Sequence, residues 1–388
     1  MIKFLLRKEY FGGTLFSIKS GKRIYVSAEE FKSLEKKGTI ALNFSKEMGE
    51  AGDIKIIYPV LLPKAGFSFP DTIFFEVTRE CNLHCKYCFN NSGDEMDGEM
   101  EFNKQIKIIT ECADSGVQEV RFTGGEPMVL ECLWDLIMEA SQNNLRVSMG
   151  TNGTLITRES AIKLSLCGLN MAIVSIDGLK KIHDSLRGQG NFLKSINGIR
   201  NLREQGIDVR VNIVAMKPNI EDIPRVIEFF HRLGVGVFVR RFISFGRSIK
   251  IASDFFLNSN EYEWLKNKLR MYLNDSQGII LGHYLKEESL GTRIQLPFMR
   301  HSCSVGQRAL VIDPCGKIQL CGFMSQKSSN FFGSIINESL NHVWQRVLAE
   351  NPAGCLLKIL DSYNESGIGM KTNCLAIASA FRRKEQTL

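Results

Sequence analysis

The sequence lacks any long apolar segment. No run approaches the ~18 apolar residues that a membrane-spanning helix requires, and the N-terminus has neither the apolar region nor the small-residue cleavage site of a secretory signal. Dense blocks of lysine and arginine with interleaved aromatic residues are also missing, which removes support for nucleic-acid binding. These absences predict a cytoplasmic protein whose partners are neither membranes nor nucleic acids.

The length and composition are those of an ordinary globular protein. The chain has 388 residues, of which 44% are hydrophobic and 23% are charged, so it can bury the cores of two or three domains. Its formal net charge of +7 has two interpretations. One is a solubility surplus over a large surface. The other is attraction to an acidic partner, such as an acidic leader peptide or a low-potential electron donor of the ferredoxin or flavodoxin type.

Cysteine is unevenly distributed. The chain has 11 cysteines, with none at residues 168–302, and in a cytoplasmic protein they are better explained as metal ligands or reactive thiols than as disulfides. Cys81, Cys85 and Cys88 form a C-x3-C-x2-C run directly after the strand-like residues 72–77. Such thiolates suit zinc or an iron–sulfur cluster. Zinc normally needs a fourth protein ligand, whereas a four-iron cube held by three thiolates keeps one iron open.

Short β-rich runs alternate with helical patterns from residue 72 to about residue 245. Six such β–α units predict a parallel sheet with right-handed crossovers, and six are too few to close an eight-stranded barrel. The predicted fold class is therefore α/β, with a partial (β/α)6 TIM-like barrel. The predicted strands are residues 72–77, 117–122, 146–150, 171–176, 208–215 and 236–242. In such sheets the chemistry lies at the carboxyl ends of the strands.

Polar and glycine-rich motifs accompany these strands. Thr123-Gly124-Gly125-Glu126-Pro127 follows the second strand directly. Its glycines let the backbone approach a ligand closely, and its carboxylate can accept hydrogen bonds from an ammonium group. The later strands carry or precede Asn152, Ser175, Asp177, Arg187, Asn212 and Val239.

The cysteine loop and the strand-end motifs together resemble those of the radical S-adenosylmethionine (SAM) enzymes, over residues 72–245. The resemblance implies that the three cysteines hold a [4Fe–4S] cluster, whose open iron chelates the amino and carboxylate groups of SAM. It implies that Glu126, with Gly124 and Gly125, binds the amino group. Arg187, whose planar fork suits a carboxylate, would bind that group of SAM, and Ser175 the ribose or carboxylate region. The other implied cofactor contacts are Tyr87, Phe89, Asn152, Asp177, Asn212 and Val239, the last against adenine.

The same resemblance implies a reaction. One electron from the reduced cluster cleaves SAM to methionine and a 5′-deoxyadenosyl radical, which abstracts a hydrogen atom from the substrate. The protein's tasks are to bind, to orient and to exclude competing reactions. No catalytic acid or base can be named from the sequence.

The cysteines after residue 300 resemble the opening of a SPASM or twitch domain, which binds auxiliary iron–sulfur clusters. Residues 311–320 are predicted to form a β-hairpin that brings Cys303 and Cys321 together, and residues 332–344 a strand leading into a helix. The dense cysteine block of the full SPASM pattern is missing. The resemblance therefore implies one auxiliary [4Fe–4S] cluster, with an apo domain as the alternative. Its implied ligands are Cys303, Cys321, Cys355 and Cys374, with Cys315 as a substitute.

The first 65 or so residues are predicted to form a small module of β-strands and one helix. The strand-like runs are residues 3–6, 14–18 and 23–26, with Gly12-Gly13 as a break. Ser27 and Glu30 form a capping box for a helix that ends near Lys37. The module resembles the peptide-binding winged-helix element of enzymes that modify ribosomal peptides, which bind a leader peptide as an extra strand. A structural cap for the barrel is the alternative.

These patterns predict three parts: an N-terminal module and linker at residues 1–70, a radical SAM core at 71–285, and an auxiliary cluster domain at 286–388. The primary hypothesis is a radical SAM enzyme that modifies a ribosomally synthesised peptide, by a thioether, a carbon–carbon crosslink or a similar change. One alternative is the same chemistry on a small molecule, such as a tetrapyrrole or a cofactor precursor. The other is a metal protein with a structural or redox-sensing role.

Overall fold

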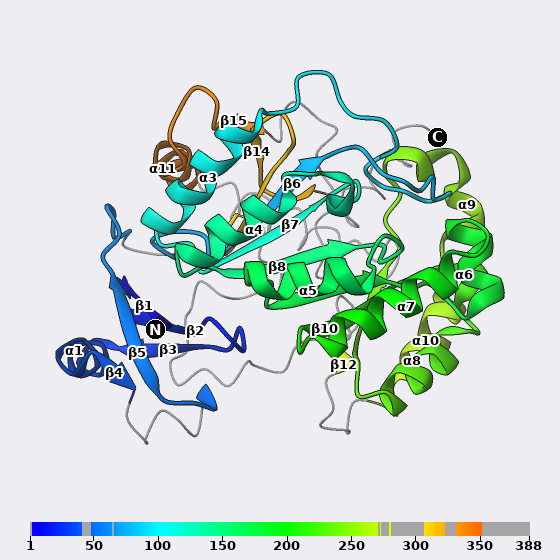
Figure 1. The fold of residues 1–388 in the computed structure, drawn as a ribbon, viewed down its shortest axis with the longest axis horizontal. Helices are drawn as coiled ribbons and strands as arrows, with labels where there is room; N and C mark the ends of the chain where they lie inside the picture. The colour runs from blue at the N-terminus through cyan, green and yellow to red at the C-terminus, as the bar shows by residue number, and fades with distance from the viewer. Residues whose placement is uncertain are drawn as a thin grey trace.

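The computed structural model describes residues 2–40, 48–63, 66–270, 272, 279–280, 306–322 and 331–350. Its centre is a curved sheet with the strand order β12-β11-β10-β9-β8-β7-β6-β13-β14-β15 (Figure 1). The six strands β6 to β11 run parallel in chain order and confirm the predicted partial barrel. They are β6 (Thr72–Thr78), β7 (Glu119–Gly124), β8 (Arg146–Thr151), β9 (Met171–Ser175), β10 (Asp208–Ala215) and β11 (Gly236–Arg241). A two-residue strand, β12 (Ile279–Ile280), extends the β11 edge.

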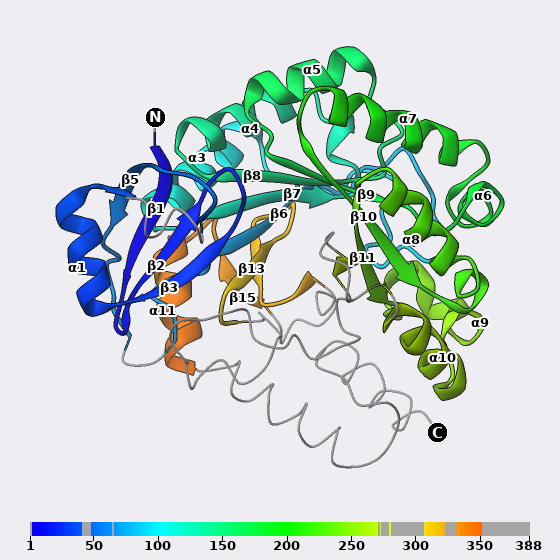
Figure 2. The ribbon, with the colours of Figure 1, turned by 90° about the horizontal axis from the view of Figure 1, so that it is seen from below.

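Helices cover the convex face of this sheet (Figure 2). They are α3 (Phe102–Asp114), α4 (Leu133–Gln142), α5 (Arg158–Cys167), α7 (Asn191–Glu204), α8 (Ile223–Arg232) and α10 (Ser259–Arg270). The shorter helices α6 (Lys180–Arg187) and α9 (Ala252–Phe255) pack in a second apolar cluster with Tyr87. Outward-facing strand residues such as Phe75 and Phe122 are buried in one hydrophobic core with the apolar helix faces. Among the described residues, no helix has the length and apolar character that crossing a membrane would require.

The concave face of the sheet is the polar one. In β10, Val209, Val211 and Ile213 are buried, whereas the alternate residues Arg210 and Asn212 are partly exposed. Successive side chains of a strand point to opposite faces, so the apolar set packs on the helices and the polar set lines the inside of the partial barrel. This alternation places polar side chains on the face where the motifs converge.

The C-terminal strands continue the barrel sheet. β13 (Ala309–Ile312) pairs in parallel with β6, and β14 (Lys317–Gln319) returns antiparallel, which confirms the predicted hairpin. β15 (Phe331–Ser334) and α11 (Leu340–Glu350) follow, as the predicted strand and helix. The Trp344 ring of α11 packs 6.0 Å from that of Phe69, centroid to centroid. The hairpin and α11 therefore share the barrel's hydrophobic core.

In its described residues, the N-terminal module is a separate five-stranded sheet that packs against helix α1 (Ala28–Lys37). Its strands, in spatial order, are β3 (Arg23–Ser27), β2 (Gly12–Ser17), β1 (Ile2–Glu9), β5 (Gly52–Ile57) and β4 (Thr39–Ile40). The capping box of Ser27 and Glu30 is confirmed. The break predicted at Gly12-Gly13 is wrong, because both glycines belong to β2, where a Cβ on Gly12 would lie 2.2 Å from the carbonyl oxygen of Val26. β5 was not predicted, since it pairs with β1 from far along the chain.

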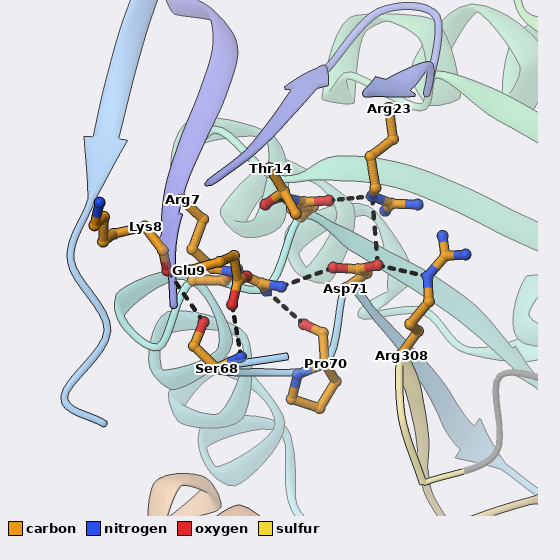
Figure 3. Close-up of polar contacts among 11 residues, drawn as sticks. Arg7, Lys8, Glu9, Thr14, Arg23, Ser68, Pro70, Asp71 and Arg308 are labelled. Atoms are coloured by element: carbon orange, nitrogen blue, oxygen red, sulfur yellow. Dashed lines mark hydrogen bonds and ion pairs between the residues drawn. The ribbon is translucent and has the colours of Figure 1, made fainter. Parts of the chain in front are cut away.

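A buried charge network docks this module on the amino-terminal end of the barrel (Figure 3). Asp71, directly before β6, accepts hydrogen bonds from Arg7 Nη2 and Arg308 Nε at 2.8 Å each, and Arg23 Nε lies 3.4 Å away. Glu9 accepts from Arg7 Nε at 2.7 Å. Burial alone would raise the pKa of Asp71, but the three guanidinium groups outweigh it and lower the pKa to about 2. The network thus fixes the module to the barrel and to the segment before β13.

Candidate active site

The three cysteines of the C-x3-C-x2-C run lie on one loop after β6. The N–H of Cys81 donates to the carbonyl of Gly93 at 2.8 Å, and the N–H of Gly93 donates to that of Arg79 at 3.2 Å. These bonds tie the two ends of the loop together. The thiols of Cys81, Cys85 and Cys88 are all partly exposed at the carboxyl end of the barrel strands.

The chemistry of this loop fits an iron–sulfur cluster. Burial raises the pKa of Cys81 to about 11 and also raises that of Cys85, so both thiols release protons when they bind iron. Among the described residues, no three cysteine, histidine or acidic side chains are grouped to hold a single metal ion. The thiolates of a four-iron cube bind separate irons, so they lie further apart than the ligands of one ion. When bound, a [4Fe–4S] cluster supplies the electron that cleaves SAM.

The glycines of the Gly-Gly-Glu-Pro motif permit a close backbone contact. A Cβ on Gly125 would lie 1.9 Å from the carbonyl oxygen of Glu80, and one on Gly124 would lie 2.2 Å from that of Thr78. The N–H of Gly125 donates to the backbone carbonyl of Thr78 at 2.7 Å, and the N–H of Glu126 donates to the backbone carbonyl of Glu80 at 2.8 Å. These glycines therefore let the motif lie directly against the protein's own backbone at the start of the cysteine loop.

Glu126 is a buried carboxylate with several donors. Its Oε1 accepts from the Thr151 hydroxyl at 2.7 Å and from the N–H of Met128 at 3.2 Å. Its Oε2 accepts from the N–H of Asn152 at 2.6 Å. Burial nevertheless raises the pKa of Glu126 to about 7. The ionised carboxylate can accept a hydrogen bond from an amino N–H, so the arrangement suits the amino group that the resemblance implies.

Asn152 links the third barrel strand to the cysteine loop. Its Nδ2 donates to Asn82 Oδ1 at 2.9 Å, and its Oδ1 accepts from the N–H of Thr154 at 2.9 Å. Its carbonyl accepts from the Ser195 hydroxyl at 2.7 Å. Asn152 thus lies beside the loop, at the position that was predicted to line the SAM pocket.

Arg187 is held beside the cysteine loop by a buried carboxylate. Its guanidinium donates to Asp177 Oδ2 and to the Tyr87 hydroxyl, and that hydroxyl also donates to Asp177. Asp177 is fully buried and accepts from the N–H of Val214 at 3.1 Å. Arg187 Nη1 lies 4.0 Å from Cys85 Sγ. Asp177 is therefore the partner of Arg187 and Tyr87, and it holds the Arg187 guanidinium beside the cysteine loop.

The three remaining strand residues do not all share one face. Ser175 and Asn212 are register partners on β9 and β10, and both are partly exposed. Asn212 Oδ1 accepts from Arg240 Nε at 2.8 Å. Val239 has no exposed surface and belongs to the core cluster on the convex side, opposite Phe238 and Arg240. This geometry does not favour the adenine contact predicted for Val239.

A buried acidic residue on β6 was missed by the sequence reasoning. Glu76 is 3% exposed, accepts from Asn90 Nδ2 at 3.0 Å and pairs with Arg79 Nη2 at 2.7 Å. The Asn90 amide also donates to the carbonyl of Gly124 at 3.2 Å. Burial raises the pKa of Glu76. A charged residue inside an otherwise apolar strand pattern was the signal that could have found it.

The predicted cofactor contact Phe89 and the predicted auxiliary ligand Cys321 are both partly buried. Phe89 follows Cys88 on the loop and packs against the barrel's core cluster. Cys321 lies two residues after the end of β14. Cys315 lies on the turn between β13 and β14, where its thiol donates to the carbonyl of Asp97 at 3.7 Å. The other predicted auxiliary ligands, Cys303, Cys355 and Cys374, lie outside the described residues.

Comparison with known proteins identifies the barrel. The family model for the radical SAM superfamily matches residues 75–230, which include the cysteine loop and strands β7 to β10. The chain carries a radical SAM domain. The protein is accordingly a radical SAM enzyme, and SAM and the [4Fe–4S] cluster characteristic of that family are its cofactors.

Two curated relatives extend the likeness beyond this domain. An AdoMet-dependent heme synthase of Nitratidesulfovibrio vulgaris is 29% identical over 292 residues, which cover 71% of this chain and 78% of that protein. The mycofactocin maturase MftC of Mycolicibacterium smegmatis is 27% identical over 288 residues, which cover 72% and 71%.

Solved structures agree in fold. SuiB of Streptococcus suis bound to SAM superposes with a TM-score of 0.66 at 16% identity, covering 88% of this chain and 87% of that chain. SuiB bound to its precursor peptide SuiA gives a TM-score of 0.65 at 17% identity with the same coverage. At these identities the likeness establishes the shared fold.

Proposed function

We propose that the enzyme uses the 5′-deoxyadenosyl radical to modify a ribosomally synthesised peptide, by a thioether, a carbon–carbon crosslink or a similar change. The observation that carries this proposal is the extent of the likeness to SuiB in its complex with a precursor peptide. Because that likeness covers 88% of this chain, it includes part of residues 1–70, the module that the sequence links to peptide recognition. The relationship to the maturase MftC supports the same substrate class.

The docking of the N-terminal module supports a role in presenting the peptide. The buried pair of Arg7 and Asp71 fixes the module to the barrel, so a peptide bound on the module has a defined position relative to the radical site. Val60, Leu61 and Leu62, after β5, are 79%, 42% and 44% exposed and offer apolar side chains to such a peptide. The net charge of +7 suits an acidic leader and an acidic electron donor, ferredoxin or flavodoxin.

A carboxylated tetrapyrrole is the second candidate substrate. The heme synthase of Nitratidesulfovibrio vulgaris is 29% identical, and the chain covers 78% of its length, which favours this substrate class on sequence likeness alone. In that case the N-terminal module would act as a cap for the barrel.

One experiment separates the two candidates. The cluster is reconstituted without oxygen, and SAM, a strong reductant and either a peptide or an iron porphyrin with propionate groups are added. The peptides are those encoded by short reading frames beside the gene. We expect 5′-deoxyadenosine together with a mass change of a peptide. Turnover of the porphyrin without any peptide change would replace the proposal with the second candidate.

A further inference from the structure

A residue outside the predicted SAM pocket clamps the cysteine loop. Arg247 lies in a short 3₁₀ helix, η3 (Gly246–Ile251), which follows β11. Its backbone N–H donates to the carbonyl of Cys88 at 3.0 Å. Its Nη1 donates to the carbonyl of Cys85 at 2.8 Å, and its Nη2 to that of Ser92 at 2.6 Å. One residue therefore bonds three carbonyls that are spread along the loop.

The backbone around this clamp is fixed on both sides. Gly246 has φ of +58°, and a Cβ on it would lie 2.2 Å from the carbonyl oxygen of Phe89, so the segment lies directly against the loop. Phe245 is 1% exposed in the core, and its N–H donates to the hydroxyl of the fully buried Ser248 at 3.0 Å. The clamp is thus built on rigid structure.

The charge of Arg247 is left for the loop. The residues next to it in the chain are not acidic. No acidic side chain among the described residues forms an ion pair with it, and its guanidinium donates to the two carbonyls. Arg187, in contrast, is paired with Asp177. Thiolates bound to iron carry negative charge, and a nearby cation in a partly buried site stabilises them. Arg247 therefore offers both geometry and charge to the cluster.

We propose that Arg247 is a positioning residue of the cluster site. It holds Cys85 and Cys88 in the loop shape that a three-thiolate cluster needs, and its positive charge stabilises the bound thiolates. The proposal rests on the [4Fe–4S] assignment and is independent of whether the substrate is a peptide or a tetrapyrrole. Substitution of a residue that orients metal ligands typically lowers metal affinity or activity by about 10–100-fold.

The test compares Arg247→Met and Arg247→Lys with the control Lys250→Met, which removes an exposed cation from the same short helix. Iron and sulfide per chain are measured after anaerobic reconstitution, and iron loss is then followed with a chelator. We expect Arg247→Met to lose iron about 10–100-fold faster than the unmodified enzyme, with Arg247→Lys intermediate and Lys250→Met unchanged. The lysine keeps the charge but cannot bridge two carbonyls with a planar fork.

A second readout separates this role from simple destabilisation. The reduction potential of the cluster should become more negative in Arg247→Met and change little in Arg247→Lys, because only the first variant removes the charge. Thermal unfolding of the iron-free proteins checks that each variant folds. If Arg247→Met does not fold, the iron-loss rate of Arg247→Lys, compared with that of the unmodified enzyme, decides the question. Iron loss and potential equal to those of the unmodified enzyme in the folded variants would overturn the proposal. None of these measurements requires the substrate.

Discussion

The carboxylate of Asp177 is fully buried and is bonded to the guanidinium of Arg187. The Tyr87 hydroxyl also donates to Asp177, and Arg187 Nη1 lies 4.0 Å from Cys85 Sγ. The position of the one cation predicted to bind the SAM carboxylate therefore depends on a carboxylate that no solvent reaches. Two variants can test this dependence.

Asp177→Asn should destabilise the iron-free protein by about 3–5 kcal/mol, because it leaves the buried Arg187 charge without a counterion. Adding Arg187→Met should recover part of the loss, since the double variant has no unpaired charge. Urea unfolding measures both effects, and Asp208→Asn, at a side chain that is 45% exposed, is the control. If the two substitutions lower the free energy of unfolding additively, the double variant will be less stable than Asp177→Asn by the whole effect of Arg187→Met alone. That result would contradict the pairing of the two residues.

SAM binding should weaken as the pH falls below 7. Burial raises the pKa of Glu126 to about 7, so this carboxyl becomes protonated over that range and loses its attraction for the amino group of SAM. The expected loss approaches about tenfold in affinity per pH unit below the pKa. Calorimetric titration of the cluster-loaded enzyme with SAM from pH 6 to 7.5 measures it. Glu126→Gln, which cannot titrate, should bind SAM weakly and with an affinity that does not change over this pH range. If its SAM affinity shows the same pH dependence as the unmodified enzyme, the titrating group is not Glu126.

Local patterns were sufficient to predict the barrel and the convergence of its motifs. Each strand from β6 to β11 is apolar on the face that packs on helices, and parallel strands joined by right-handed crossovers bring their carboxyl ends to one edge. Residues such as Glu126 and Asn152, 26 positions apart, meet there for that reason. The capping box at Ser27 was predictable because all of its atoms lie within four residues.

Contacts between distant segments could not be predicted from such patterns. β5 pairs with β1 across some 50 residues, and Arg247 reaches Cys85 across 162 positions. A single arginine after a strand has no distinctive local pattern. For Val239 the strand was predicted, but the burial of this side chain in the core on the convex side could not be. Which face points inward depends on how the strand packs.

Gly125→Ala should abolish cluster loading, because the new Cβ would lie 1.9 Å from the carbonyl oxygen of Glu80, at the start of the cysteine loop. The matched control is Gly150→Ala, at the end of the next strand, where the nearest atom to a new Cβ is the Thr123 hydroxyl oxygen at 3.5 Å. Iron and sulfide content after reconstitution measures the difference. Equal cluster content in both variants would show that the contact seen at Gly125 is not needed for the site.

The docking of the N-terminal module should weaken in acid. Asp71 is 1% exposed, and three guanidinium groups lower its pKa to about 2 from an ordinary value of 3.8. A depressed carboxyl pKa contributes stability that is fully present above the unfolded value and is lost as the pH falls through the folded value. The contribution of Asp71 should therefore disappear between about pH 4 and pH 2, and its size is roughly 2–3 kcal/mol.

Asp71→Asn removes this contribution at every pH and leaves Arg7, Arg23 and Arg308 without their shared carboxylate. At neutral pH the variant should therefore unfold at lower urea concentration than the unmodified protein. The difference between the two should shrink below pH 4, as the carboxyl in the unmodified protein becomes protonated. Asp53→Asn, at an exposed position of β5, should leave both the urea midpoint and its pH dependence unchanged. A constant difference down to pH 2 would mean that the variant acts through lost packing, because the charge of Asp71 would then contribute nothing that acid removes.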